Sequence, residues 1–449
     1  MNNVSQAAVC RWLLGLALAA AFSAAAEPAP VFTMEDCLRS GLAKDIRVAN
    51  ARREQQAADA RYRQYRARIL PEVTARGAYQ RQDEIATFDF GGATLPMGRL
   101  DNYSASVEVR QLIYDGGAVQ AGLRAADVYR ARAAHALRQA EADRARDIRL
   151  AFHAMLFARE AVGVEERRME QLERFVADAE ARFRQEALSE FDLMSARVRL
   201  ANARPDLIRA RRDLQLARAA LRNLAWLDAD DFDISGEWTF DPRLPDLPAA
   251  QTVAVHNRPE AQQLRQTVGL AEADLRAEKG TYSPVFRARA GYAGQNPPGF
   301  GSSENDWEWH WSVGLTVEWT MFDGLSRPNR IREKRLVYDQ TAAALADLER
   351  EIALEVERAH LALCHATEAA AAARENVALA DRAVEIARVR FNAGLSTRLE
   401  FIESSVAAAV ARLNWFGALR AQRDARALLE WACGGPLDRL PPAAGAPAP

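Results

Sequence analysis

The residues that could carry chemistry are few, and the densest group is the segment HLALCH, which contains His360, Cys364 and His365. On a helix, His360 and Cys364 would lie one turn apart on the same face. Two ligands do not make a metal site, so we expect these side chains to be packed or solvated. The sequence also contains no glycine-rich phosphate loop, serine elbow or His-Glu metal motif. We therefore predict no enzymatic activity, no metal and no cofactor.

The bulk composition argues against nucleic acid as a partner. Of the 449 residues, 59 are Lys or Arg and 61 are Asp or Glu, which gives a formal net charge of −2. Proteins that bind nucleic acid need a clear excess of basic residues to contact phosphates. Acidic and basic residues are instead interspersed, as on solvated helix faces that carry ion pairs between successive turns.

The N-terminus predicts export. Arg11 precedes the apolar run Trp12 to Phe22, and alanines follow at positions 24 to 26, so we expect a signal peptide over residues 1–26. The apolar run is too short to span a membrane, and no later segment has about 18 uncharged apolar residues in a row. We therefore expect an exported chain without a helical anchor. The remaining cysteines are too few and too scattered for a disulfide framework; they are Cys37, Cys364 and Cys433.

The sequence contains a tandem repeat. The DG pairs at Asp115 and Asp323 are 208 residues apart (323 − 115), and the RF pairs at Arg182 and Arg390 have the same offset (390 − 182). We divide the chain into a first repeat at 27–225, a linker at 226–248 that is rich in Asp and Pro, a second repeat at 249–434, and a Pro/Ala tail at 435–449 that we expect to be disordered.

Each repeat is expected to begin with an amphipathic helix (Met34 to Arg68; Ala249 to Glu278) and to end in a much longer helical hairpin (about 116–225 and 324–434). A helix of about 70 residues would be roughly 100 Å long. Such lengths are typical of coiled coils and helical tubes rather than of globular domains. Pro205 is expected to kink or interrupt the return helix of the first hairpin.

Between these helices, each repeat has two strand-like segments with alternating polar and apolar residues (about 71–115 and 284–323). In DWEWHWSVGLTVEWTM the apolar face has aromatic residues at its ends and aliphatic residues in its middle. Trp307 to Trp319 would span about 40 Å of strand, or roughly 30 Å of bilayer at a 40° tilt. A closed barrel is the one way such a chain can cross a bilayer. We therefore expect a lipid-facing aromatic girdle of Trp307, Trp309, Trp311, Trp319, Tyr79, Tyr103 and Tyr292.

The opposite face of these strands would line the barrel lumen. It carries both signs of charge, which predicts no strong filter there, and its residues are Arg76, Glu108, Arg110, Arg287, Arg289, His310 and Glu318. Known barrels start at eight strands, so four strands must be completed by neighbouring chains. A symmetric homo-oligomer follows, although the strand count does not choose between two and three subunits.

These motifs together resemble the TolC family of outer-membrane efflux proteins. The resemblance covers nearly the whole mature chain and rests on the duplicated hairpins, NRPE at Asn257 to Glu260, a proline before each first strand, DGG and DGL after the second strands, and RF with GLST at the turn. It implies a mostly α-helical homotrimer in which four strands per protomer form a twelve-stranded outer-membrane β-barrel. Twelve helices would continue it as an α-barrel across the periplasm. A periplasmic adaptor and an inner-membrane transporter are the implied partners.

The resemblance also implies a gate at the periplasmic helix turns, where acidic side chains ring the constriction. Aligned on Gly394, the acids of the second repeat fall at Glu400 and Glu403, and the matching acid of the first repeat falls at Asp192. A ring of acids would bind cations and repel anions. The alternative is that they are simply exposed helix acids beside a turn.

The sequence departs from the family pattern at this gate. Where the family has a basic latch residue soon after the turn glycine, this chain has Ser396, with Arg398 two residues further on. The aromatic latch partner is Phe391, which lacks a hydroxyl, and the first turn has Glu186 in place of the usual glycine.

We therefore predict a passive exit duct in the outer membrane, serving a tripartite efflux pump or a type I secretion system. The alternative is a non-conducting, elongated periplasmic scaffold or adaptor. A scaffold shares the long hairpins but has no reason for lipid-facing aromatic strands. The exported cargo, whether drug, metal or protein, is not encoded in these motifs.

Overall fold

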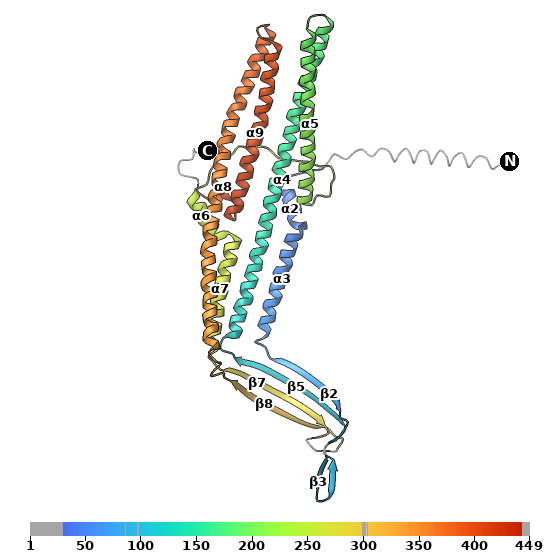
Figure 1. The fold of residues 1–449 in the computed structure, drawn as a ribbon, viewed down its shortest axis with the longest axis vertical. Helices are drawn as coiled ribbons and strands as arrows, with labels where there is room; N and C mark the ends of the chain where they lie inside the picture. Colours follow the sequence, from blue (N-terminus) through green and yellow to red (C-terminus); the bar gives the residue numbers. More distant parts are fainter. Residues whose placement is uncertain (1–29, 86, 97, 299–301, 303, 442–449) are drawn as a thin grey trace, which may run out of the picture.

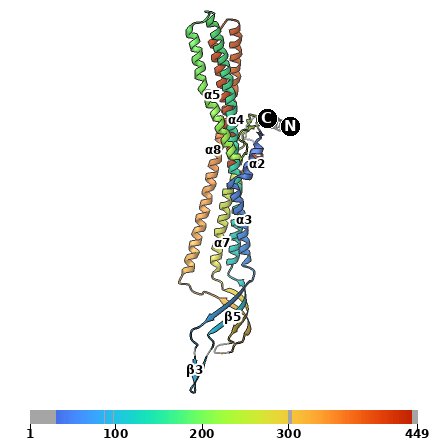
Figure 2. The same cartoon turned by 90° about the vertical axis from the view of Figure 1, so that its right-hand side faces the viewer.

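The computed structural model describes residues 30–441 apart from 86, 97, 299–301 and 303. The predicted signal peptide and the end of the predicted tail lie outside the described residues. The protomer is elongated, with a β-sheet at one end and helical hairpins that extend to the other (Figures 1 and 2).

The two repeats have the same series of helices, which confirms the predicted long hairpins. The first repeat contains α2 (Met34–Lys44), α3 (Ile46–Ala67), α4 (Ala118–Arg184) and α5 (Glu190–Ala225). The second contains α6 (Leu247–Asn257), α7 (Pro259–Gly280), α8 (Ser326–Asn392) and α9 (Arg398–Cys433). The 67 residues of α4 and of α8 correspond to about 100 Å each.

The prediction of one continuous helix at the start of each repeat is wrong. Asp45 separates α2 from α3 in an extended conformation, and its carboxylate accepts hydrogen bonds from the N–H groups of Arg47 and Val48, so it caps α3. Arg258 separates α6 from α7 in the same conformation. The following Pro259 disfavours a helical conformation at Arg258 and suits the first turn of α7.

Two further expectations are corrected. The sequence predicts a kink or an interruption of the return helix at Pro205; the interruption is wrong, because α5 is one helix from Glu190 to Ala225. On either side of the proline, Ala203 is fully buried and Leu207 packs against the same cluster, which includes Met169 and Leu172 of α4. The first part of the predicted tail is structured rather than disordered, because Leu437–Arg439 form a 3-10 helix (η1) and Leu437 is buried in the core of the second repeat.

One antiparallel sheet combines the strands of both repeats. Its order is β2-β5-β7-β8, so the hairpins of the two repeats are joined through β5 and β7. A two-stranded ribbon at the tip of the first hairpin, β3 with β4, is an element that the sequence reading missed (Figure 1). The strands are β2 (Glu72–Arg81), β3 (Thr87–Phe90), β4 (Ala93–Pro96), β5 (Asp101–Tyr114), β7 (Val285–Asn296) and β8 (Glu308–Glu318).

The repeated aspartates fix the junction between sheet and long helix. The Asp115 carboxylate accepts hydrogen bonds from the N–H groups of Gly117 (3.1 Å) and Val119 (2.8 Å) at the start of α4. Asp323 accepts from the N–H of Arg327 (2.9 Å) at the start of α8. Both carboxylates therefore satisfy free N–H groups in the first turn of a helix, where negative charge is stabilising.

The largest cores lie about half-way along the molecule, at the level where the linker crosses the helices; we call this level the equator. There β1 (Val31–Phe32) pairs with β6 (Asp233–Ile234). Cys37 is buried in the core of the first repeat and Cys433 in that of the second. All cysteines of the described chain are free thiols, and burial raises the pKa of Cys37 and of Cys433 to about 11.

Candidate functional site

The apolar face of the sheet is uncovered in the protomer. Along β8, Trp311, Val313 and Leu315 are exposed by 76%, 74% and 64%. A sheet face of this composition needs a partner, because soluble proteins rarely leave a continuous apolar strip in water. Among the described residues, none of the helices has a segment apolar enough to cross a bilayer.

The predicted girdle residues gather at the two ends of this face. At the end away from the helices, the ring of Trp309 stacks on Tyr292 (5.2 Å between centroids) and on Trp307 (5.4 Å). Tyr79 lies against Tyr103 at 5.1 Å in the same part of the sheet. At the helix end, the indole N–H of Trp319 donates to the carbonyl of Tyr282 (3.0 Å).

A glycine makes room for the stacked indole. A Cβ atom at Gly294 would lie 2.6 Å from the ring of Trp309, its neighbour across the strand pair. No real Cβ approaches an aromatic carbon so closely, so any other residue at 294 would displace the ring. Sequence reasoning missed this residue, although a glycine inside a strand is a signal for close approach of a neighbour.

The polar face carries the predicted lumen residues, and ion pairs connect several of them. Glu108 pairs with Arg110 (2.7 Å) and lies 3.7 Å from Arg76, while Arg287 pairs with Glu318 (2.9 Å). His310 is exposed and lies opposite Ala293. Close to the helices, a hollow of about 860 Å³ opens on this face between the end of α3 and the four strands.

At the opposite end of the protomer, the predicted gate residues lie beside the helix turns of both repeats. The Asp192 carboxylate accepts a hydrogen bond from the hydroxyl of Ser189 (2.6 Å), which itself caps α5. Glu400 and Glu403 are exposed in the first turns of α9. The ring of Phe391 stacks on Phe401 at 6.2 Å. Arg398 begins α9, but its side chain lies outside the described part.

The HLALCH segment does not assemble a metal site. His360 bonds the carbonyl of Pro245 (2.9 Å), and the Cys364 sulfur lies 3.6 Å from the same ring. His365 is exposed, and its Nδ1 lies 3.9 Å from a carboxylate oxygen of Glu368, one turn further along α8. Across the described residues, no three His, Cys, Asp or Glu side chains are placed to hold a metal ion.

Comparison with known proteins decides the family. The family model for outer membrane efflux proteins matches residues 38–225 and 252–435, once for each repeat. The chain belongs to this family. Its members are trimeric channels of the outer membrane that work with efflux pumps.

Solved structures agree with this fold. CusC, reported with the conformational changes of folding and transmembrane channel formation, is 15% identical with a TM-score of 0.74, covering 92% of this chain and 96% of its own. A membrane protein of Pseudomonas aeruginosa is 18% identical with a TM-score of 0.74, covering 91% and 92%. The open state of the MtrE channel of Neisseria gonorrhoeae is 16% identical with a TM-score of 0.72, covering 90% and 89%. A search of curated proteins finds no match.

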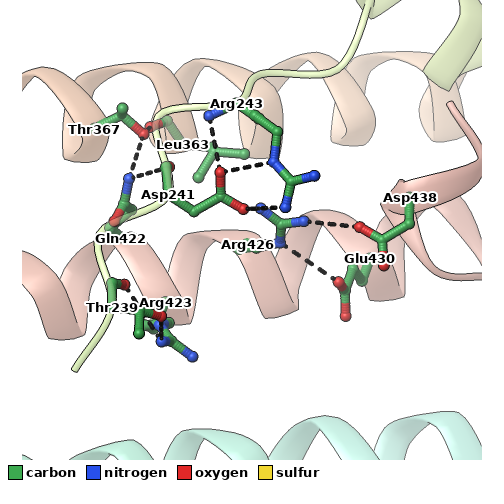
Figure 3. A network of polar contacts seen from close by, with 10 residues as sticks. All are labelled: Thr239, Asp241, Arg243, Leu363, Thr367, Gln422, Arg423, Arg426, Glu430 and Asp438. Atoms are coloured by element: carbon green, nitrogen blue, oxygen red, sulfur yellow. Dashed lines mark hydrogen bonds and ion pairs between the residues drawn. The ribbon is translucent and has the colours of Figure 1, made fainter. Parts of the chain in front are cut away.

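In this efflux family member, the equatorial linker is held by a polar network that the sequence reading missed (Figure 3). The Arg243 guanidinium donates two hydrogen bonds of 3.0 Å to Asp241, and Arg426 of α9 donates a third (2.5 Å). The bonds from Arg243, supported by Arg426, lower the pKa of Asp241 to about 2. The buried amide of Gln422 bridges the Asp241 carbonyl and the hydroxyl of Thr367.

Proposed function

We propose that this family member is the passive exit duct of a tripartite efflux pump or type I secretion system. Three protomers would form a twelve-stranded barrel in the outer membrane, continued by twelve helices through the periplasm. The observation that carries the proposal is the exposed apolar sheet face with aromatic ends, placed at one end of the two 67-residue helices α4 and α8. Four strands cannot close a barrel, so both edges of the sheet require further copies, while the apolar face would meet lipid.

The partners follow from the position of the two ends. With the sheet in the outer membrane, the helix turns lie roughly 100 Å away in the periplasm. At that distance they can meet a periplasmic adaptor and an inner-membrane transporter. Neither nucleic acid nor a cofactor has a role in this proposal.

The gate of the duct would lie at the helix turns. Glu400 and Glu403 are exposed on α9 one turn apart, and Asp192 occupies the corresponding place on α5. Repeated by threefold symmetry, these acids would form rings that concentrate cations at the entrance. Arg398 and Phe391 adjoin the same turn, where they replace the latch residues usual in the family.

Single-channel recording in planar bilayers tests both parts of this proposal. The purified protein should form open channels, and Glu400→Ala with Glu403→Ala should change conductance and reduce cation preference. A matched control is Glu368→Ala with Glu375→Ala, which removes two exposed acids of α8 far from the turns. Unchanged conductance in the turn variant would reject the gate.

Absence of any channel would favour the non-conducting scaffold instead. Localisation separates the two functions independently, because a duct should appear in outer-membrane fractions as trimers whose electrophoretic mobility changes on heating. A periplasmic scaffold should be released with the soluble periplasmic proteins.

A further inference from the structure

The polar face of the sheet carries both positive and negative side chains, but they are not evenly distributed along it. Register pairs Arg110 of β5 directly with Arg289 of β7, and Arg287 lies two residues before Arg289 on the same face of β7. All three lie on the half of the sheet next to the helices. Like charges directly opposite each other destabilise a strand pair, so folding alone does not favour this arrangement.

The carboxylates nearby neutralise only part of this charge. Glu108 lies 2.7 Å from Arg110, and Glu318 lies 2.9 Å from Arg287. Glu72 is the register partner of Arg110 on its other side. Within the described part of the chain, Arg289 has no carboxylate within ion-pair distance, and it shares the field of Glu108 with Arg110 and Arg76. Its side chain is exposed on the lumen side of β7.

Arg289 also has space around it. Its neighbour on β8 is Gly314, where a Cβ atom would approach the Arg289 Nε to 3.3 Å, so the glycine lets the guanidinium lie across the strand. The hollow of about 860 Å³ begins here, and Arg68 at the end of α3 lines it as well. The Arg68 guanidinium lies over the ring of Tyr65 rather than beside a carboxylate.

We propose that Arg289, with Arg110 beside it and Arg68 across the hollow, forms a binding site for anionic groups where the barrel meets the helices. The inference rests on the proposed duct. Guanidinium groups bind carboxylate and phosphate oxygens through paired hydrogen bonds. Threefold repetition would make a cationic ring that opposes the acidic turns at the far end. The duct then selects by charge at two levels, cations at its entrance and anionic groups of the cargo near its exit.

The test is block of single-channel current by tripolyphosphate added on the barrel side. Arg289→Gln should weaken the block by about tenfold, which corresponds to one lost charge-assisted hydrogen-bonding group. It should also shift the reversal potential in a potassium chloride gradient toward cation preference. Arg289→Lys should preserve the reversal potential while weakening the block less. The control is Arg81→Gln, since Arg81 pairs with Asp101 (3.3 Å) at the other end of the sheet.

Equal block in the native protein and in Arg289→Gln would overturn the site while leaving the duct intact. If the native protein does not conduct, the duct is wrong, and titration calorimetry of the solubilised protein with tripolyphosphate decides the site separately. A site predicts binding that Arg289→Gln removes; equal or absent heat rejects it. A purely structural role for Arg289 predicts lower thermal stability in Arg289→Gln, whereas relief of the Arg110 repulsion predicts unchanged or higher stability.

Discussion

In both repeats the successive helices have 11, 22, 67 and 36 residues. Each long hairpin turns through the same hydrogen bonds: the N–H of Ala187 to the carbonyl of Arg182 in the first repeat, and Leu395 to Arg390 in the second. The residues that adopt this common backbone nevertheless differ.

Four pairs of positions 208 residues apart have positive φ in both repeats. Gly116 and Gly324 are both glycine, whereas in the other three pairs only one repeat has glycine. Those three pairs are Gly117 (97°) with Leu325 (66°), Glu186 (57°) with Gly394 (73°), and Trp226 (51°) with Gly434 (70°). A side chain in this conformation costs roughly 1–2 kcal/mol. The hydrogen bonds at the helix ends therefore impose the turn, and glycine only makes it less costly.

The breaks in the first helices differ in charge. Asp45 of the first repeat bonds Arg144 of α4 at 2.6 Å, while Arg258 of the second repeat pairs with Glu355 of α8. Arg258 also lies over the ring of Trp431 of α9. The same interruption of the helix is thus stabilised by opposite charges, so the geometry rather than either residue type is common to the repeats.

The strongest test of this comparison removes one member of a buried pair. Asp45→Ala should lower the free energy of unfolding by about 3–5 kcal/mol, because it leaves Arg144 buried without its partner and removes the cap of α3. The side chains of Asp45 and Arg144 are only 6% and 8% exposed. Denaturant unfolding followed by circular dichroism measures the loss.

The control is Arg47→Ala, which removes a side chain that is 61% exposed. This substitution should change the free energy of unfolding little. The double variant Asp45→Leu with Arg144→Leu should recover part of the stability. A single-variant loss below about 1 kcal/mol would contradict a charge-stabilised break.

The linker gives a second, smaller test, because its two ends are held differently. Near the first repeat, Asp230 and Asp231 make exposed ion pairs with Arg222 and Arg218. Near the second repeat, Asp241 is 27% exposed with a pKa lowered to about 2. The folded state holds this pKa below its ordinary value near 4. The ionised Asp241 carboxylate therefore makes its full contribution to the free energy of unfolding above about pH 4, and this contribution is lost as the pH falls toward 2.

The loss attributable to Asp241 should be about 1–2 kcal/mol after allowance for solvent screening. It is measured as the difference between the native protein and Asp241→Asn in unfolding experiments from pH 6 to pH 2. The difference should shrink as the pH falls. A difference that is constant over this range would show that the carboxylate charge does not hold the linker.

The smallest expected effect exchanges residues between the two hairpin turns. Glu186→Gly should stabilise the protein by about 0.5–1 kcal/mol, since relief of the left-handed conformation is partly offset by the flexibility of glycine in the unfolded chain. Gly394→Ala should destabilise it by about 1 kcal/mol. Ala393→Gly, one residue earlier and at a negative φ, serves as a control for flexibility alone and should destabilise the protein. Destabilisation by Glu186→Gly as well would refute the role of backbone conformation.

The framework could be predicted from sequence because its signals are periodic and repeated. Alternation in the Trp307 segment, the 208-residue offset and uninterrupted helical composition each extend over many residues. The β3–β4 ribbon was missed even though Gly91 and Gly92, both with positive φ, mark its turn. Features that depend on one residue were missed. The helical composition around Asp45 predicted one continuous helix, although Asp45 separates α2 from α3 and caps α3.

The sequence could predict only which face of the sheet and which end of the helices carry the site residues. Strand parity assigned Arg289 to the polar face, but its position opposite Arg110 depends on the register between two repeats that are distant in sequence. The role of Gly294 depends on the same register, because the indole it accommodates comes from another strand. Asp241 gave no periodic signal, and its partners Arg243 and Arg426 are brought together only by the fold.

The continuous helices α4 and α8 have a mechanical consequence. Each runs without a break from the sheet to the turns and is packed most firmly at the equator, so it can act as a lever with its pivot near the middle. With arms of about 50 Å, a tilt of about 5° would move the turns by roughly 4 Å. In the proposed duct, a small rotation at this well-packed waist would therefore be enough to widen or close an aperture at the helix turns.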